Sequence, residues 1–162
     1  MSQKIVPTDR SIAWISVVSQ FILILILMGI IFGVFYILKV KEPFIFVGFT
    51  YLLLSFALKK IFLRNHNKGI TLTKEGKNVE AIISFEKSAK FFGDHRWLDH
   101  YRFLTLLSAS KYHYREMALV NISYCYMALD NQDKAKKYYM KVLQEYPDNE
   151  MAKLGLSIIN SK

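Results

Sequence analysis

The hydrophobic pattern divides the chain near residue 64. Before that point lie two long uncharged stretches, residues 11–38 and 43–58, and two lysines with three more apolar residues extend the second stretch to residue 63. At about 1.5 Å per residue, the first stretch makes roughly 42 Å of helix, enough to cross a hydrocarbon core of about 30 Å. The second is long enough if the lysine stems extend toward the membrane surface; the alternative is a helix in a soluble core. The predicted transmembrane helices span about residues 11–38 and 43–63, after a polar tail at residues 1–10.

Beyond residue 63 the apolar positions follow a helical period. Between Glu116 and Pro147 they recur at i, i+3, i+4 and i+7 in two series, separated by Asp130 and Asn131. Asp and Asn favour a turn, and Pro147 ends the second series because its ring clashes with a continuing helix. This predicts a helical hairpin. The positions are Leu119, Ile122, Ser123, Tyr126 and Leu129, then Ala135, Tyr139, Val142, Leu143 and Tyr146.

The spacing within this helical hairpin resembles the tetratricopeptide repeat, a pair of helices of about 34 residues. Leu, Ser and Tyr stand where the family has Trp, Gly and Phe, and Ser123 and Ala135 are small where two helix backbones are expected to approach closely. The resemblance implies a helical scaffold that binds proteins and usually performs no catalysis. The residues in register with the family pattern are Leu119, Ile122, Ser123, Tyr126, Ala135, Tyr139 and Pro147.

A weaker copy of the same spacing lies upstream. Its first helix carries Asn65 and Lys68 where large apolar residues are usual, so a simple continuation of the second membrane helix is the alternative there. The residues that repeat the offsets of Ser123, Tyr126, Ala135 and Tyr139 are Gly69, Leu72, Ala81 and Phe85.

The two copies are further apart than one repeat. The surplus, about residues 94–110, predicts an inserted helix with Trp97, Tyr101 and Leu104 along one face. Asp148 is expected to cap a last helix, which closes the exposed end of the array and carries Met151, Leu154, Ile158 and Ile159. The resemblance thus covers about residues 69–162 and not the membrane part. The predicted fold is all-α: a two-helix transmembrane hairpin at residues 11–63, followed by a tetratricopeptide-like domain at residues 64–162.

The composition favours a membrane protein, and the distribution of Lys and Arg predicts its orientation. Apolar residues make up 52% of the chain, the mean hydropathy is +0.18 and the net charge is +9. Lys and Arg near the predicted membrane number two in the tail, two between the helices and four after the second helix. Since cytoplasmic segments carry the excess of Lys and Arg, we expect a multi-pass cell-membrane protein with both termini cytoplasmic. Four residues are placed to contact anionic lipid headgroups: Lys59, Lys60, Arg64 and Lys68.

The residues that usually carry chemistry form no recognisable site. One cysteine, Cys125, allows neither an internal disulfide nor a Cys-rich metal site. His95, Asp99 and His100 are close in sequence but match no zinc motif, and the chain has neither a glycine-rich phosphate loop nor a nucleophile elbow. We therefore expect no enzyme, no cofactor and no metal.

A basic and aromatic stretch follows the first copy. Nucleic acid is disfavoured as its ligand, because Asp94 and Asp99 dilute the charge and no RNA-binding module is recognisable. Anionic lipid headgroups or plain solvent are the other interpretations. The basic residues are Lys87, Lys90, Arg96, Arg102, Lys111 and Arg115.

The favoured function is a membrane-anchored protein-interaction or assembly scaffold; the alternative is a structural subunit whose transmembrane hairpin packs into a larger membrane complex. The helix at about residues 112–129 has a second, mostly apolar face. Because a helix that is apolar on nearly all sides is buried on nearly all sides, we expect the inserted helix to cover this face. If it does not, an open groove offers Asn121, Tyr124 and Met127 to a partner protein.

Overall fold

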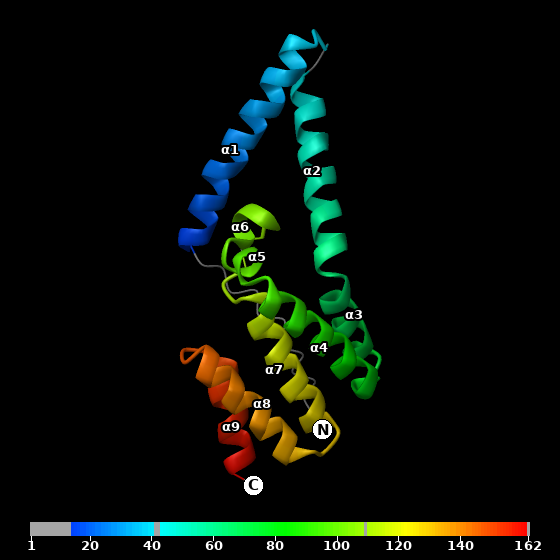
Figure 1. Ribbon diagram of the computed structural model, residues 1–162, viewed down its shortest axis with the longest axis vertical. Coiled ribbons are helices and arrows are strands. Elements are labelled where there is room, and N and C mark those ends of the chain that lie inside the picture. Colours follow the sequence, from blue (N-terminus) through cyan, green and yellow to red (C-terminus); the bar gives the residue numbers. More distant parts are fainter. Residues whose placement is uncertain (1–13, 41–42, 109, 162) are drawn as a thin grey trace. The chain divides into compact units, whose positions relative to one another are not determined.

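The structure, a computed structural model, describes residues 14–40, 43–108 and 110–161 (Figure 1). The described residues form α-helices joined by short turns, which confirms the all-α prediction. The helices are α1 Trp14–Ile37, α2 Pro43–Phe62, α3 Arg64–Lys74, α4 Asn78–Asp94, α5 Arg96–His100, α6 Arg102–Thr105, α7 Tyr114–Ala128, α8 Gln132–Glu145 and α9 Glu150–Asn160.

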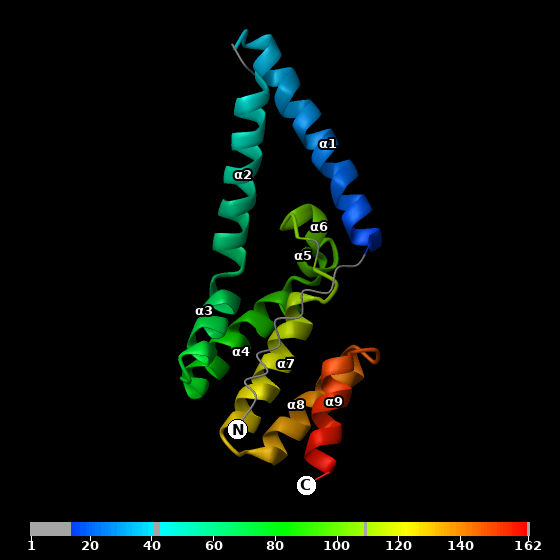
Figure 2. The same cartoon turned by 180° about the vertical axis from the view of Figure 1, so that it is seen from behind.

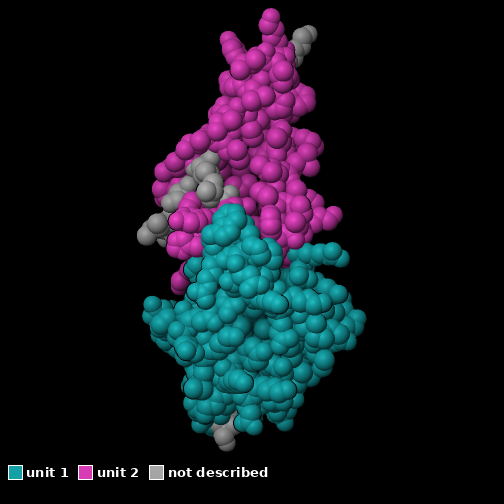
Figure 3. Space-filling model, viewed as in Figure 1, with its two compact units in different colours: residues 1–9, 64–99, 112–162 teal, residues 10–63, 100–111 magenta. Residues whose placement is uncertain are grey.

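The chain forms two compact units, coloured separately in Figure 3. Of the described residues, the repeat unit holds residues 64–99 and 112–161, and the hairpin unit holds residues 14–63 and 100–111 apart from the three undescribed positions among them. The split falls at residue 64, where the hydrophobic pattern changes.

In the hairpin unit, α1 and α2 run antiparallel and pack together near their connection. Phe32 lies against Phe44 with ring centroids 4.9 Å apart, and Phe35 lies 5.8 Å from Phe46. Lys39 adopts a left-handed backbone with φ of 54° and ends α1, while the amide of Val40 donates to the carbonyl of Phe35. Residues 38–40 therefore cap the end of α1.

The outer surface of this hairpin is apolar. Of the described helices, one segment, Phe44–Phe62, is long and apolar enough to cross a membrane by length and composition, and Ile24–Ile37 is a shorter apolar segment. Large apolar side chains are exposed along both helices, among them Phe21, Leu25, Ile30, Phe44, Phe49 and Phe56.

In the repeat unit, α3 with α4 and α7 with α8 form two helical pairs of the same design. The first helix of each pair ends in a left-handed residue, Gly76 with φ of 78° and Asp130 with φ of 55°. In each case the next amide, of Lys77 or Asn131, donates to a carbonyl five residues back. The weaker copy is therefore a structural repeat, and α3 is a helix of its own instead of a continuation of α2.

Small residues sit where these helices cross. Ala81, Ser123 and Ala135 are fully buried, as the spacing predicted. A Cβ at Gly69 would come within 2.7 Å of the Phe85 ring, so only glycine fits there. The second pair continues into α9, which packs on α8 (Figures 1 and 2). A helix thus follows the array, as expected.

The insertion is not one helix. It forms two short helices, α5 and α6, with Tyr101 between them, and α4 itself runs to Asp94. Side chains in this segment bond to backbone groups far along the chain: Asp99 to residues 114 and 115, and Arg102 to residues 110 and 111. Such bonds compete with a continuous helical ladder.

Candidate partner-binding site

The central element of the repeat unit is α7. It packs against α4 on one side and α8 on the other, with α3 and α9 touching it as well. Its buried residues lie on several faces, and include Leu119, Val120, Ile122, Ser123 and Cys125. The expectation that this helix is buried by its own chain holds, but the covering helices belong to the array.

The prediction that the inserted segment covers α7 is wrong. Trp97 is 60% exposed and Tyr101 is 48% exposed, so neither ring is packed away. The side chain of Leu104 lies outside the described part of the structure. In the hairpin unit, α6 packs on α1 instead.

The start of α7 is held by a buried polar cluster. Both carboxylate oxygens of Asp99 accept backbone hydrogen bonds, from Tyr114 at 2.7 Å and from Arg115 at 2.9 Å. Glu116 accepts from the amide of His113 at 3.1 Å and from the side-chain amide of Asn149 at 2.7 Å. Asp99, Glu116 and Asn149 are each at most 5% exposed, so this cluster fixes the first turn of α7.

Sequence reasoning missed this cluster. It grouped Asp99 with nearby histidines and placed the cap of the last helix at Asp148. In the structure Asn149 caps α9, because its side-chain oxygen accepts from the amide of Ala152 at 2.7 Å. The available signal was Glu116 three residues after His113, a spacing typical of a capping box.

The three predicted partner-binding residues do not all share one environment. Asn121 is 4% exposed, and within the described chain its side chain makes no hydrogen bond, whereas Tyr124, one turn further on, is half-buried. Met127 is turned toward the array, since its sulfur accepts a hydrogen bond from the Tyr139 hydroxyl at 3.4 Å. Burial raises the pKa of Tyr139 to about 12, so this hydroxyl keeps its proton. Their role in partner binding stays a prediction.

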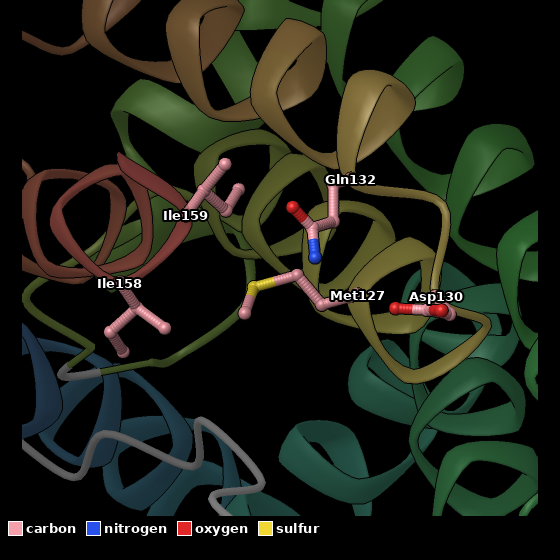
Figure 4. A pocket seen from close by; sticks show the side chains of 5 residues that line it. All are labelled: Met127, Asp130, Gln132, Ile158 and Ile159. Atoms are coloured by element: carbon pink, nitrogen blue, oxygen red, sulfur yellow. The ribbon is translucent and has the colours of Figure 1, made fainter. Parts of the chain in front are cut away.

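Met127 also lines a small hollow between the ends of α7 and α9 and the start of α8 (Figure 4). The side chains of Asp130, Gln132, Ile158 and Ile159 complete its wall. Its volume of about 20 Å³ has room for one water molecule and not for a small-molecule ligand.

A larger, open depression of about 560 Å³ lies on the repeat unit, where α4 and α8 flank α7. At its edge the Tyr138 hydroxyl donates to Glu86 at 3.0 Å, and burial together with this bond raises the pKa of Tyr138 to about 12. Its charges are mixed, since Glu86 and Asp94 stand among Lys90, Arg96 and Lys141.

Arg115 crosses the base of this depression. Its guanidinium donates to both carboxylate oxygens of Glu145, at 2.7 and 2.9 Å, and to the carbonyl of Ala89 at 2.6 Å. The bond to Glu145 raises the pKa of Arg115 and lowers the pKa of Glu145. A Cβ at Gly93 would collide with this guanidinium, so the glycine makes room for it.

The four basic residues predicted to contact lipid lie on α2 and α3. Lys59 and Lys60 lie in the last turn of α2, and the ammonium of Lys60 is 5.7 Å from the Phe56 ring centroid. Arg64 and Lys68 are exposed on α3. In the part of the chain that the structure describes, no group of three or more His, Cys, Asp or Glu side chains could hold a metal ion.

Comparison with known proteins supports the repeat. Residues 117–149 match the family described as Tetratricopeptide repeat. The matched segment covers most of α7, all of α8 and the turn before α9. The resemblance is therefore confirmed for this segment. No curated protein and no solved structure matches the chain. The chain thus carries a tetratricopeptide-like segment, a kind of unit typical of protein–protein interaction.

Proposed function

We propose that this chain is a membrane-anchored adaptor that acts by binding and not by catalysis. The hairpin unit fixes it in the bilayer, and the repeat unit holds another protein at the cytoplasmic face. The observation that carries the proposal is the tetratricopeptide match at residues 117–149, because arrays of such helical pairs present extended surfaces for protein binding.

The exposed apolar surface of α1 and α2 supports membrane anchoring. Phe44 is 74% exposed and Phe49 is 61% exposed, and α2 carries Lys59 and Lys60 in its last turn, at its cytoplasmic end in this orientation. In a bilayer, lipid tails cover such an apolar surface. In water, the same surface would stay exposed to solvent, which is unfavourable. Lys59, Lys60, Arg64 and Lys68 would then meet anionic headgroups, each contributing about 1 kcal/mol near the surface.

Orientation is tested with single cysteines in a Cys125→Ser background. The proposal places Lys39 outside the cell and Lys136, an exposed residue of α8, in the cytoplasm. A membrane-impermeant thiol reagent applied to intact cells should label Lys39→Cys and leave Lys136→Cys unlabelled until the cells are opened. The reverse pattern would invert the topology.

The proposed binding surface is the face of α7 that carries Asn121 and Tyr124. Asn121 is 4% exposed and its side chain makes no hydrogen bond to described residues, so a partner reaches this amide only when the side chains over it move aside, and it then supplies a hydrogen bond. The side chain of Asn offers both donors and an acceptor, which suits the backbone of an extended peptide segment. Tyr124, half-buried beside it, supplies a ring for packing.

The Asn121→Ala variant tests this surface. Because the Asn121 side chain makes no hydrogen bond to described residues, its removal should change the free energy of unfolding by less than about 1 kcal/mol. Partner recovered with the full-length chain from native membranes should nevertheless fall. Met140→Ala, at a 56% exposed position of α8, is the matched control and should recover the partner normally. Equal recovery by both variants would rule out this face.

The second candidate function is a structural subunit. The same exposed apolar rings on α1 and α2 also suit packing against other membrane helices, in which case the repeat unit only supports the assembly.

A further inference from the structure

The insertion that separates the two repeats has a property that protein binding does not explain. Of the described residues, 100–108 and 110–111, named here the docking loop, group with the two apolar helices and not with the repeats, and α6 within the loop packs on α1. The part of the chain that interrupts the repeat array is therefore associated with the proposed membrane anchor.

Aromatic rings are exposed along this part of the chain. Tyr101 is 48% exposed at the start of the docking loop, and Trp97, four residues upstream, is 60% exposed. The stretch from Phe103 to Ser110 contains no charged residue, but Leu106, Leu107 and Ser108 within it are buried, so Tyr101 and Trp97 provide the exposed apolar surface. Tyr and Trp are the residues enriched at membrane–water interfaces, because each combines an apolar ring with a polar group.

Several backbone polar groups of the docking loop are hydrogen-bonded within the protein. The guanidinium of Arg102, which is 8% exposed, donates to the carbonyls of Ser110 at 2.8 Å and Lys111 at 2.7 Å, and so ties the two ends of the loop together. The carbonyl of Arg102 in turn accepts from the amides of Leu106 and Ser108, both at 3.1 Å. Non-helical backbone is tolerated near lipid only when such groups are paired within the protein.

The charges at the edges of the loop suit a headgroup layer. Lys111 is exposed at one end, while the one guanidinium within the loop is turned to backbone carbonyls. Exposed basic groups beside apolar rings are the pattern of segments that lie in the membrane interface with the cation toward phosphate.

We propose that the docking loop lies in the headgroup–acyl boundary of the bilayer, beside α1, with the Tyr101 ring among the lipids. This inference rests on the proposed membrane hairpin and adds to it a second attachment. Since the loop joins residues 64–99 to residues 112–161, a docked loop ties the repeat unit to the membrane from within the array.

The test uses single-tryptophan variants of the full chain in phosphatidylcholine–phosphatidylglycerol vesicles with brominated acyl chains. In a Trp14→Phe, Trp97→Phe background, Tyr101→Trp reports on the docking loop, Phe49→Trp on the hairpin, and Met140→Trp serves as a control on α8. Interfacial segments lie about 5–10 Å into the headgroup–acyl boundary, so bromine near the headgroup end should quench Tyr101→Trp about twofold more than bromine near the methyl end. Met140→Trp should not be quenched.

The outcomes separate this proposal from the proposed function. Quenching of both Tyr101→Trp and Phe49→Trp supports both. If only Phe49→Trp is quenched, the membrane anchor stands and the docking loop is overturned. If only Tyr101→Trp is quenched, the loop docks but the hairpin does not span, and quenching of neither variant overturns both. Circular dichroism of each variant checks that it is folded.

Discussion

At the scale of single residues, Ala135 shows why the repeat could be recognised from the sequence. It is fully buried, like Ala81 at the same place in the first pair. Where helices pack this closely, a larger side chain has no space, so the packing requires a small residue. Small residues therefore recur at a fixed spacing that can be recognised in the sequence. Gly69 beneath the Phe85 ring is a second example.

The first prediction concerns this contact. Ala135→Leu should lower the free energy of unfolding by about 1–3 kcal/mol, because the added carbons overpack the core. Lys137→Leu, two residues along on the exposed side of α8, is the matched control and should change it little. Thermal unfolding in detergent, followed by circular dichroism, measures both. Equal midpoints for the two variants would contradict the proposed register.

His66 makes the stability of the repeat unit depend on pH. It is 4% exposed, and its ring lies between Phe85 and Tyr114, with centroids 5.7 and 5.5 Å away. Its ring nitrogen is 3.4 Å from the Ser88 hydroxyl. Burial lowers the pKa of His66 from 6.5 to about 4. The unfolded chain therefore binds the proton first, and stability present above about pH 6.5 is lost as the pH falls toward 4.

The second prediction follows from that shift. Between pH 7.5 and pH 5 the free energy of unfolding should fall by roughly 2 kcal/mol because of His66, since each unit of pKa shift corresponds to about 1.4 kcal/mol. The His66→Asn variant does not titrate and should lose less stability over the same range. Chemical unfolding at the two pH values measures the difference, and identical pH dependence in both proteins would exclude His66 as its origin.

At the scale of elements, the insertion shows what the periodicity of a sequence leaves out. The sequence predicts one helix against α7, yet the insertion forms two short helices with exposed rings. The bonds that shape it join side chains to backbone groups eight or more residues away, such as Asp99 to Tyr114 and Arg102 to Ser110. The spacing of apolar residues shows which side of a helix is buried. Hydrogen bonds between distant side chains and backbone groups do not affect that spacing, so they could not be predicted from it. The repeat pairs, which depend on apolar spacing, were predicted correctly.

The third prediction tests the cap that the insertion provides. Asp99→Ala should destabilise the repeat unit by about 1–3 kcal/mol, because two backbone donors at the start of α7 lose a charged acceptor in a buried place. Asp94→Ala, at an exposed residue at the end of α4, is the matched control. A loss of the same size in both variants would show that the carboxylate of Asp99 does not hold α7.

At the scale of the whole molecule, an apolar helical hairpin is followed in the chain by a short repeat array. The residues that would bind a partner could be predicted only in part. Asn121 and Tyr124 lie on one face of α7, whereas the sulfur of Met127 accepts a hydrogen bond from Tyr139 within the array. How far a residue of α7 is buried by neighbouring repeats depends on the number of repeats and on how they pack. The pattern of apolar residues within one helix does not contain that information.

The central claim is that a partner protein is held by the repeat unit of a chain anchored through its hairpin, and site-specific photo-crosslinking in native membranes tests it most directly. A photoreactive residue is placed in the full chain at Tyr124, at the hairpin position Phe49, or at the control position Met140, and the crosslinked proteins are identified by mass spectrometry. We expect one protein to be captured from Tyr124 and not from Met140, and lipid to be the main adduct at Phe49. Capture of a membrane protein from Phe49, with none from Tyr124, would contradict it and favour the structural subunit.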